Sequence, residues 1–296
     1  MNEQRSHADQ RDVFVLSGGA ARGAVQVGMI QTLMEAGITP CGFAGTSVGA
    51  LNAAFMAWDT SLARAYELGS KWEHLTTRDI FPGGTWARLA HLAQRHPYLF
   101  SSDALRSLIA EWVPVRRIED LTTPLRVTTT PLASDHATYH DHGDLAPILL
   151  ASAAVPGVFA PVDLQESDGR LVPHVDGGVA DLVPVAGAAS LSPTRVFVLD
   201  ATVPARLPHA RTPIEILVAS LGVATRVRPL ADLGPDVQVL HVHTADLGTR
   251  MTDFTRTADH ISLGRRAAAD LLDTMLTPTP SPHGFRRLFG RFAHAA

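Results

Sequence analysis

Cysteine and long apolar runs are scarce in this sequence. One cysteine, Cys41, occurs among 296 residues, so an internal disulfide is excluded and a reducing compartment is favoured. No apolar run approaches the ~20 residues that a membrane-spanning helix needs. Residues 1–12 are polar and lack the apolar stretch of a secretory signal. We therefore expect a cytoplasmic protein in which Cys41 is a buried structural thiol.

An excess of charge of either sign is also absent. The chain has 25 Lys and Arg residues against 29 Asp and Glu residues, a net charge of −4. This balance gives no electrostatic case for nucleic acid as a partner. With 46% hydrophobic and 18% charged residues, the composition is that of a soluble globular protein. A chain of this length can bury a full core, and one large domain is the simplest organisation.

The chain does contain alternating short apolar runs and helical patterns, which favour an α/β fold with a mainly parallel central sheet. The expected strands are residues 13–16, 41–44, 125–132, 136–140, 162–164, 170–175, 195–200 and 237–242. The expected helices are one that ends at Gly37 and residues 48–58, 63–74, 103–112, 145–152 and 259–276. We expect a disordered segment at 1–12, one domain over 13–276, and a Pro-rich spacer with a short basic tail over 277–296.

A Gly-x-Ser-x-Gly pentapeptide, Gly45-Thr-Ser-Val-Gly49, lies between the second expected strand and an unbroken helical pattern. In that context a serine can occupy a strained turn where flanking Cβ atoms would clash and the hydroxyl projects from the backbone. Ser47 is therefore the leading candidate for a nucleophile. Because the pentapeptide alone has low specificity, a base and an oxyanion site must come from elsewhere in the chain.

A second turn of small residues, Ser17-Gly-Gly-Ala-Ala-Arg-Gly23, follows the first expected strand. Small residues leave backbone N–H groups unobstructed, and the following helix N-terminus adds partial positive charge. The amides of Gly18, Gly19 and Ala20 could hold the oxyanion of a tetrahedral intermediate, worth ~3 kcal/mol per donor. A dinucleotide or phosphate loop is the alternative. Its Gly-x-Gly-x-x-Gly or Gly-x-x-x-x-Gly-Lys spacing is missing, so oxyanion or phosphate-ester binding is favoured.

The candidate general base is Asp176, which is followed by two glycines at the end of an expected strand. Gly177 and Gly178 let the backbone turn sharply away from the carboxylate. A carboxylate is a weak base in water, with a pKa near ~4. In a dry cleft beside a serine hydroxyl, desolvation would raise that pKa and allow direct proton transfer.

Histidines leave other possibilities open, because 14 of them occur in the chain. A Ser-His-Asp triad is conceivable, and His174, two residues before Asp176, is its best member. His241 and His243 share one face of an expected strand and read as an ordinary half-exposed pair. A metal site is also conceivable in one hairpin, although a solvated hairpin is favoured; its residues are Asp135, His136, His140, Asp141, His142 and Asp144.

Taken in order, these motifs closely resemble those of the patatin-like phospholipases. The set comprises the glycine-rich turn with Arg22-Gly23, the Ser47 pentapeptide, Ala151-Ser-Ala-Ala-Val-Pro-Gly-Val-Phe-Ala-Pro-Val162, and Asp176-Gly-Gly178 with Pro184 beyond it. The resemblance covers roughly residues 13–200. It implies a patatin-like three-layer α/β/α fold with a mainly parallel central sheet. The segment from Ala151 to Val162 would pack near the site and help to shape an acyl pocket.

The resemblance also implies a Ser–Asp dyad without a catalytic histidine, a metal or a cofactor. Ser47 would be the nucleophile, Asp176 the base, and the turn at Gly18, Gly19 and Ala20 the oxyanion hole. Supporting positions would be Arg22, Gly23, Gly45, Gly49, Gly177 and Gly178. The family usually has a third glycine where this chain has Ala20, which would cost on the order of 1 kcal/mol if that position needs positive φ. Arg22 could bind phosphate or make structural hydrogen bonds.

The function expected from this resemblance is hydrolysis of carboxylic esters in lipids, as a phospholipase A, lysophospholipase or carboxylesterase. The alternatives are an acyltransferase with the same dyad and a non-catalytic lipid-binding protein. The tail would supply peripheral membrane contact at the inner face through a short interfacial helix, or would dock on the domain or fray. Its apolar stripe is Phe285, Leu288, Phe289 and Phe292, and its basic residues are Arg286, Arg287 and Arg291.

Overall fold

The computed structural model describes residues 10–81, 98–166, 168–202, 228–245 and 252–276, with four isolated positions between 216 and 224. The strands are β1 (Asp12–Leu16), β2 (Gly42–Thr46), β3 (Leu125–Pro131), β4 (Thr138–His140), β5 (Val162–Gln165), β6 (Leu171–Asp176), β7 (Arg195–Asp200) and β8 (Gln238–His243). The α-helices are α1 (Gly23–Glu35), α2 (Val48–Trp58), α3 (Leu62–His74), α4 (Thr77–Ile80), α6 (Asp103–Trp112), α7 (Leu145–Ser152), α8 (Val185–Ala188) and α10 (Thr257–Leu276). Short 3₁₀ helices are η2 (Ala20–Arg22), η3 (Ile118–Asp120), η4 (Gly177–Val179) and η5 (Ala189–Leu191).

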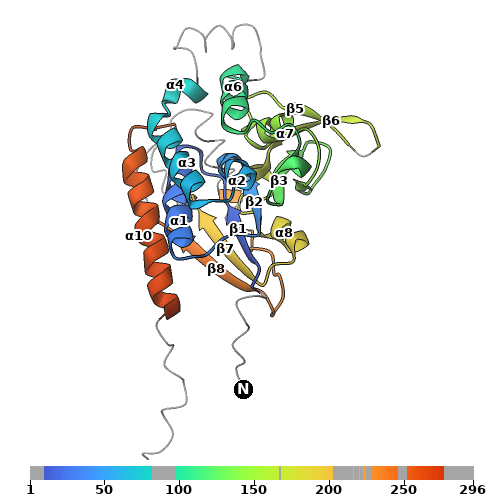
Figure 1. Cartoon of the computed structure of the whole chain (residues 1–296). Helices are drawn as coiled ribbons and strands as arrows, with labels where there is room; N and C mark the ends of the chain where they lie inside the picture. The colour runs from blue at the N-terminus through green and yellow to red at the C-terminus, as the bar shows by residue number, and fades with distance from the viewer. Residues whose placement is uncertain are drawn as a thin grey trace, which may run out of the picture.

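The strands form one sheet in the order β5-β6-β3-β2-β1-β7-β8, with β4 paired to β3 (Figure 1). The five strands from β3 to β8 in this order are parallel to their neighbours. Strands β4, β5 and β6 pair antiparallel. The fold is therefore α/β with a mixed, mostly parallel sheet. The carboxyl ends of β1 and β2 lie next to each other, where loops of parallel α/β sheets commonly hold functional groups.

The two faces of the sheet are covered unequally. Phe14 and Leu16 of β1 point into a large core that includes buried residues of α1, α2, α3, α6, α7 and α10. Val13 and Val15 point the other way, into a small cluster closed by α8 and η5. The alternation follows from the period of two along a strand. Edge-to-face contacts of the Phe14 ring with Phe43 and Phe197, at 6.1 and 5.6 Å, join three neighbouring strands in the large core.

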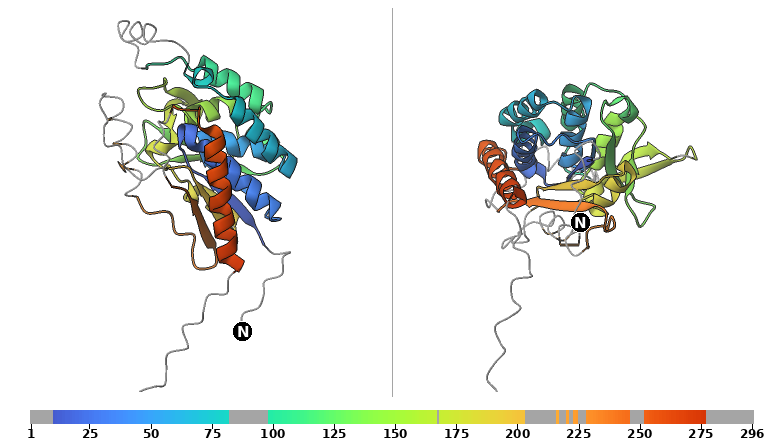
Figure 2. Two further views of the ribbon diagram at one scale, coloured as in Figure 1. Left: turned by 90° about the vertical axis from the view of Figure 1, so that its left-hand side faces the viewer. Right: turned by 60° about the horizontal axis from the view of Figure 1, so that its bottom comes forward.

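Helix α10 packs tightly against α1, and Figure 2 shows the two side by side on the same side of the sheet. Glycines permit this approach. A Cβ atom at Gly28 would lie 2.0 Å from the Ile261 carbonyl oxygen, and one at Gly264 would lie 1.9 Å from the Val25 carbonyl oxygen. The backbones of α10 and α1 are thus in direct contact, and this contact holds in place the helix that follows the glycine-rich turn.

The expected elements are present with boundaries that coincide or differ by one or two residues, as is usual for element ends. The strand expected at 13–16 begins at Asp12, whose carboxylate is bound by the Arg195 guanidinium at 2.7 Å. The terminal helix begins at Thr257 instead of residue 259. Cys41 precedes β2, is half-buried and unpaired, and its pKa is raised by burial. The tail at 277–296 and most of the N-terminal segment lie outside the described residues.

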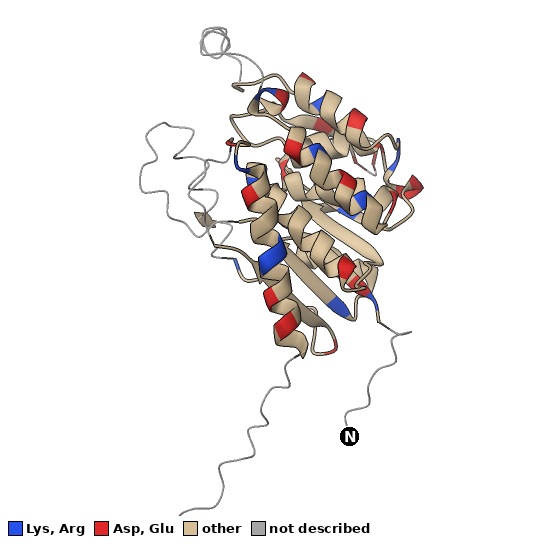
Figure 3. Ribbon diagram, turned by 60° about the vertical axis from the view of Figure 1, so that its left-hand side comes forward, with Lys and Arg blue, Asp and Glu red and all other residues tan. Residues whose placement is uncertain are grey.

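Charged residues of both signs are interspersed on the outer faces of the helices in the view of Figure 3, whereas the strands carry few of them. This mixture matches the near-neutral composition. In the described part of the chain, no helix is long and apolar enough to cross a membrane.

The α1–α10 contact yields a stability prediction. Alanine normally stabilises a helix relative to glycine, but Gly264→Ala should lower the free energy of unfolding by about 2 kcal/mol or more, because the new methyl group meets backbone. Gly69→Ala in α3 is the matched control, since its Cβ would meet side chains and no backbone: the end of Gln31 at 2.8 Å and Val27 at 3.6 Å. That variant should change stability by less than about 1 kcal/mol. Urea denaturation measures both, and equal effects would contradict the prediction.

Candidate active site

Ser47 lies on a strained turn between β2 and α2. Its backbone has φ 55° and ψ −126°, and the helix begins at the next residue, Val48. The flanking glycines are needed for close approach and not for positive φ. A Cβ at Gly45 would lie 2.6 Å from the Ala50 Cα, and one at Gly49 would lie 2.4 Å from the Leu16 carbonyl oxygen. The pentapeptide therefore lets α2 start directly against β1 and β2, with the serine at the helix N-terminus.

Sheet register brings Asp176 to the level of Ser47. Thr46, the last residue of β2, is the partner of Thr128 in β3, and Thr129 is the partner of Asp176 in β6. Gly177 packs against β3 so closely that a Cβ would lie 2.3 Å from the Thr128 carbonyl oxygen. Two residues that are far apart in the sequence thus become neighbours across one intervening strand.

The Asp176 carboxyl is buried and has few partners. Its Oδ1 accepts a 2.7 Å hydrogen bond from the Gly178 N–H, and its Oδ2 is buried without a close hydrogen bond from any described residue. Burial raises the pKa of the carboxyl to about 6, although interactions with the Ser47 side chain and the Gly178 amide lower it. The Ser47 hydroxyl is thus beside the carboxyl without a fully formed bond, as acid–base pairs often are before substrate binds.

One short segment at the end of α7 holds both residues. The Ser47 N–H donates to the Ser152 hydroxyl at 2.9 Å, and the Asp176 N–H donates to the Ala154 carbonyl at 2.9 Å. Ser152 is fully buried. Sequence reasoning identified this segment only as one that packs near the site. The serine in its Ala-Ser-Ala-Ala-Val-Pro-Gly run was the available signal, but no local pattern shows which amide a buried hydroxyl accepts from.

The glycine-rich turn lies beside Ser47, with one difference from expectation. The Gly18 N–H donates to the Leu182 carbonyl at 3.0 Å, so this amide is occupied and cannot serve as a free donor. A Cβ at Gly18 would lie 3.4 Å from the Ser47 Cβ. No described residue accepts a hydrogen bond from the Gly19 or Ala20 amide. These two N–H groups, at the start of η2, are therefore the donors that the turn has available.

Ala20 adopts the left-handed conformation that the sequence analysis considered, with φ 50°. For an L-residue other than glycine this conformation costs roughly 1–2 kcal/mol. A residue with a side chain is tolerated less well at the neighbouring Gly19, because its Cβ would lie 2.7 Å from the Ala201 Cβ. The turn thus keeps glycine where neighbours are close and tolerates strain at Ala20, whose side chain lines the cavity beside Ser47.

Arg22 is a structural residue of the turn. Its side chain is 1% exposed, and it donates to the Ala201 carbonyl at 3.0 Å and to the Thr244 hydroxyl at 3.1 Å. A phosphate-binding role does not fit this burial. The next residue, Gly23, leaves room for Val48, since a Cβ there would lie 2.6 Å from the Val48 Cγ2. Arg22 therefore holds the turn to the segments that follow β7 and β8, and Gly23 allows it to pack against the start of α2.

A buried polar network supports the turn from behind. The Ser17 hydroxyl lies 3.1 Å from Asp200 Oδ1 and accepts the Ala201 N–H at 2.7 Å. Although burial raises the pKa of Asp200, hydrogen bonds from His241 and Thr202 hold it below its usual value. An ionised carboxylate at the end of β7 thus anchors the start of the turn. This role of Asp200 is not predictable from the sequence, because β7 and β1 become neighbours only in the fold.

The histidine alternatives are not supported by the geometry. His174 is buried, with Nδ1 bonded to the Thr129 hydroxyl at 2.8 Å and Nε2 to Glu166 at 3.0 Å, so neither nitrogen faces Ser47. In the hairpin considered for a metal, His136 and His142 each pair with the preceding aspartate. Within the described ranges, no group of three or more His, Cys, Asp or Glu side chains could hold a metal ion.

An apolar cavity of ≈ 80 Å³ begins at Ser47. Its other lining residues are Ala20, Val48, Leu51, Trp72, Leu75, Ile80, Phe81, Leu105, Leu108, Ile109, Trp112, Leu149, Ala153, Val155, Phe159 and Phe254. None of these side chains is charged. Ala153, Val155 and Phe159 come from the segment that was expected to shape an acyl pocket. The arrangement places a serine hydroxyl, a buried carboxyl and two amides without a described acceptor beside an uncharged cavity.

Comparison with known proteins is consistent with this arrangement. The family model described as patatin-like phospholipase matches residues 14–189. An uncharacterized NTE family protein of Mycobacterium tuberculosis is 30% identical over 188 residues, which cover 64% of this chain and 48% of that protein. Patatin-like phospholipase domain-containing protein 7 of Rattus norvegicus is 30% identical over 187 residues, 63% of this chain and 13% of that protein. The chain thus spans less than half the length of these relatives.

Similarity to solved structures is lower. The crystal structure of VipD from Legionella pneumophila has 15% sequence identity and a TM-score of 0.45, and the match covers 90% of this chain and 67% of that one.

The burial of Asp176 predicts an unusual dependence of stability on pH. Because its pKa rises from 3.8 to about 6 on folding, ionisation costs stability as pH increases through that window. Asp176→Asn should therefore be more stable than the unmodified protein by about 1–3 kcal/mol at about pH 8, with the gain vanishing near about pH 4. Asp168→Asn is the control, because Arg170 lowers the pKa of that exposed carboxyl. Thermal unfolding across pH measures the difference; a gain that persists in acid would contradict the assignment.

Proposed function

The chain belongs to the patatin-like phospholipase family, and from that premise we propose that it hydrolyses carboxylic esters of lipids through an acyl-enzyme on Ser47, with Asp176 as the general base. The observation that carries this proposal is the position of the Ser47 hydroxyl beside a buried carboxyl whose pKa is about 6. A carboxylate in water is too weak a base for a serine hydroxyl. Burial brings its pKa closer to neutrality, where a general base works best.

In the first half-reaction, Asp176 takes the hydroxyl proton while the Ser47 oxygen attacks the ester carbonyl carbon. The carbonyl oxygen becomes an oxyanion, for which the Gly19 and Ala20 amides are the free donors of the turn. The N-terminus of α2 adds partial positive charge at the attacking oxygen. When the tetrahedral intermediate collapses, the bond to the alcohol breaks and Asp176 returns the proton to the departing alkoxide.

In the second half-reaction, a water molecule replaces the alcohol. Asp176, again ionised, takes a proton from this water as it attacks the acyl carbon, and the collapse of the second intermediate releases the fatty acid and returns the proton to Ser47. Transfer to an alcohol or amine instead of water would use the same groups. Product analysis with competing acceptors separates hydrolysis from acyl transfer.

The cavity supports an acyl substrate with an apolar chain. Its uncharged wall begins at the nucleophile, so an ester carbonyl placed at Ser47 has one described site for its hydrocarbon part. Burial of each methylene contributes about 0.8 kcal/mol of binding. Phospholipids, lysophospholipids and simple lipid esters all share this part, and head-group preference depends on regions beyond the cavity.

Activity of active-site variants tests the proposal. Ser47→Ala should lower turnover of p-nitrophenyl butyrate at least about 1,000-fold and abolish labelling by a fluorophosphonate probe. Asp176→Asn should lower kcat about 100-fold or more with little change in KM. In the unmodified protein kcat/KM should rise with pH through an apparent pKa of about 6, since Asp176 must be ionised to act.

His174→Asn is the matched control for this series, because His174 is buried two residues from Asp176 on the same strand. The activity of this variant should stay within about tenfold of that of the unmodified protein, and the acid limb of its pH profile should be unchanged. Retained activity in Asp176→Asn together with its loss in His174→Asn would replace the dyad by a triad. Failure of the probe to label folded protein would favour a non-catalytic lipid-binding role.

We further propose that the tail gives peripheral membrane contact. Deleting residues 285–296, which include the four apolar and three basic residues, should weaken association with anionic liposomes and leave turnover of a soluble ester unchanged. Deleting residues 293–296 alone removes chain but no member of the stripe, so binding should persist. Binding should also fall as salt increases, because the electrostatic attraction is screened. Equal liposome binding by the full chain and the longer deletion would exclude this role.

A further inference from the structure

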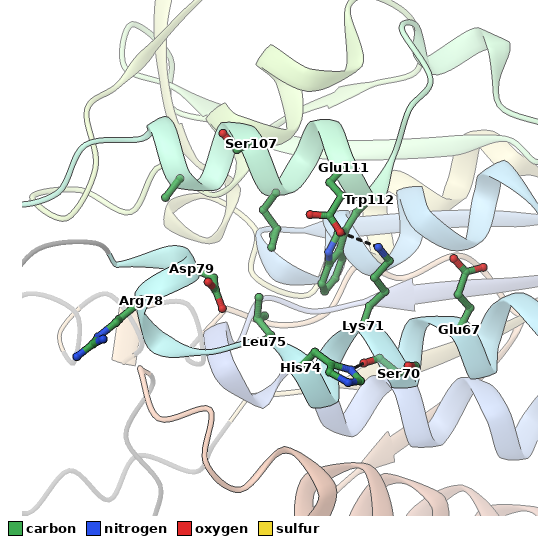
Figure 4. Close-up of a pocket in the computed structure, with 12 residues that line it drawn as sticks. Glu67, Ser70, Lys71, His74, Leu75, Arg78, Asp79, Ser107, Glu111 and Trp112 are labelled. Atoms are coloured by element: carbon green, nitrogen blue, oxygen red, sulfur yellow. Dashed lines mark hydrogen bonds and ion pairs between the residues drawn. The ribbon is translucent and has the colours of Figure 1, made fainter.

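A second hollow shares part of its lining with the apolar cavity at Ser47. An open groove of ≈ 630 Å³ runs between α3, α4 and α6 on the molecular surface (Figure 4). Its rim is polar and includes Lys71, which forms a 2.7 Å ion pair with Glu111 across the groove. The groove does not touch Ser47. Three residues, Leu75, Leu108 and Trp112, line both the groove and the cavity that begins at Ser47.

The two spaces are therefore separated by a partition one side chain thick. Trp112 is the fixed part of it, because its ring makes edge-to-face contacts with Phe55 and Trp72 at centroid distances of 6.0 and 6.2 Å. The thin part consists of two leucines from opposite walls. Leu75 directly follows α3, and Leu108 lies on α6; they are 8% and 7% exposed.

We propose that Leu75 and Leu108 set the acyl-chain length that the site accepts. The inference rests on the proposed function: an ester carbonyl at Ser47 directs its acyl chain into the apolar cavity, and the methyl end of the chain stops at the two leucines. The inner cavity of ≈ 80 Å³ then favours short acyl chains, and the groove beyond holds the space that a longer chain needs. Removal of either leucine joins the two spaces into one channel.

The test is a homologous series of p-nitrophenyl esters from acetate to palmitate, presented in mixed micelles of one detergent. The ratio of kcat/KM for palmitate to that for butyrate is the readout, because a ratio on one sample does not depend on how much of the protein is folded. Leu108→Ala should raise this ratio at least about tenfold. Leu75→Ala, on the opposite wall, should act in the same direction.

Two matched variants on α6 distinguish the partition from a general enlargement. Ile109→Ala widens the inner cavity without reaching the groove, so it should raise the ratio much less than Leu108→Ala. Ser107 lines only the groove and is exposed. As a single substitution, Ser107→Trp should leave the chain-length profile unchanged. Combined with Leu108→Ala, it should cancel the gain in the ratio, because the tryptophan fills the space that the longer chain would enter.

An unchanged profile in both leucine variants would overturn the inference, as would an equal shift in Ile109→Ala or a gain that Ser107→Trp does not cancel. Failure of the proposed function looks different. In that case no ester of the series is turned over in a Ser47-dependent way, as the Ser47→Ala variant would show.

Discussion

Two hydrogen bonds from one short segment hold the candidate site together. Ser152, the last residue of α7, accepts a hydrogen bond from the Ser47 N–H on its hydroxyl, and Ala154, two residues later, accepts one from the Asp176 N–H on its carbonyl, each at 2.9 Å. These bonds set the distance between two residues that belong to different strands and different parts of the chain. Leaving a buried amide without its acceptor lowers the free energy of unfolding by about 1–3 kcal/mol. The segment is therefore constrained by both partners at once, and any shift of it would move Ser47 and Asp176, the proposed nucleophile and base, relative to each other.

The site also contains several conformations that are unfavourable by themselves and that the surrounding structure holds in place. Ser47 and Ala20 both have positive φ, and Asp176 buries a carboxyl with a single close hydrogen bond to its side chain. Each of these features costs on the order of 1–3 kcal/mol. They persist because the surrounding backbone is over-determined by close contacts, such as Gly49 against the carbonyls of β1 and α10 against α1. A rigid core thus maintains a local arrangement that a free peptide would not adopt.

Much of the fold and the outline of the site were predictable from local pattern. The strands around Phe14 and Phe43 are short apolar runs bounded by turn residues, and the hairpin at Gly169 carries a strong turn signal. Contacts between distant segments were not predictable. Gly18 was expected to donate to an oxyanion, yet its amide is bonded to Leu182, 164 positions later in the chain. The role of Arg22 was left open for the same reason, since its acceptors are the residues that directly follow β7 and β8.

Local sequence is enough to identify the groups of the candidate site: a serine between glycines at a strand–helix junction, small residues in a second turn, and an aspartate before two glycines. These choices are local, because they follow from backbone conformation and steric contact within a few residues. Their relative positions and their surroundings depend on the fold. Register across β2, β3 and β6 brings Asp176 beside Ser47, burial raises its pKa, and packing of α3 against α6 closes the apolar cavity. Desolvation and cavity shape depend on every element around the site, and no single segment encodes them.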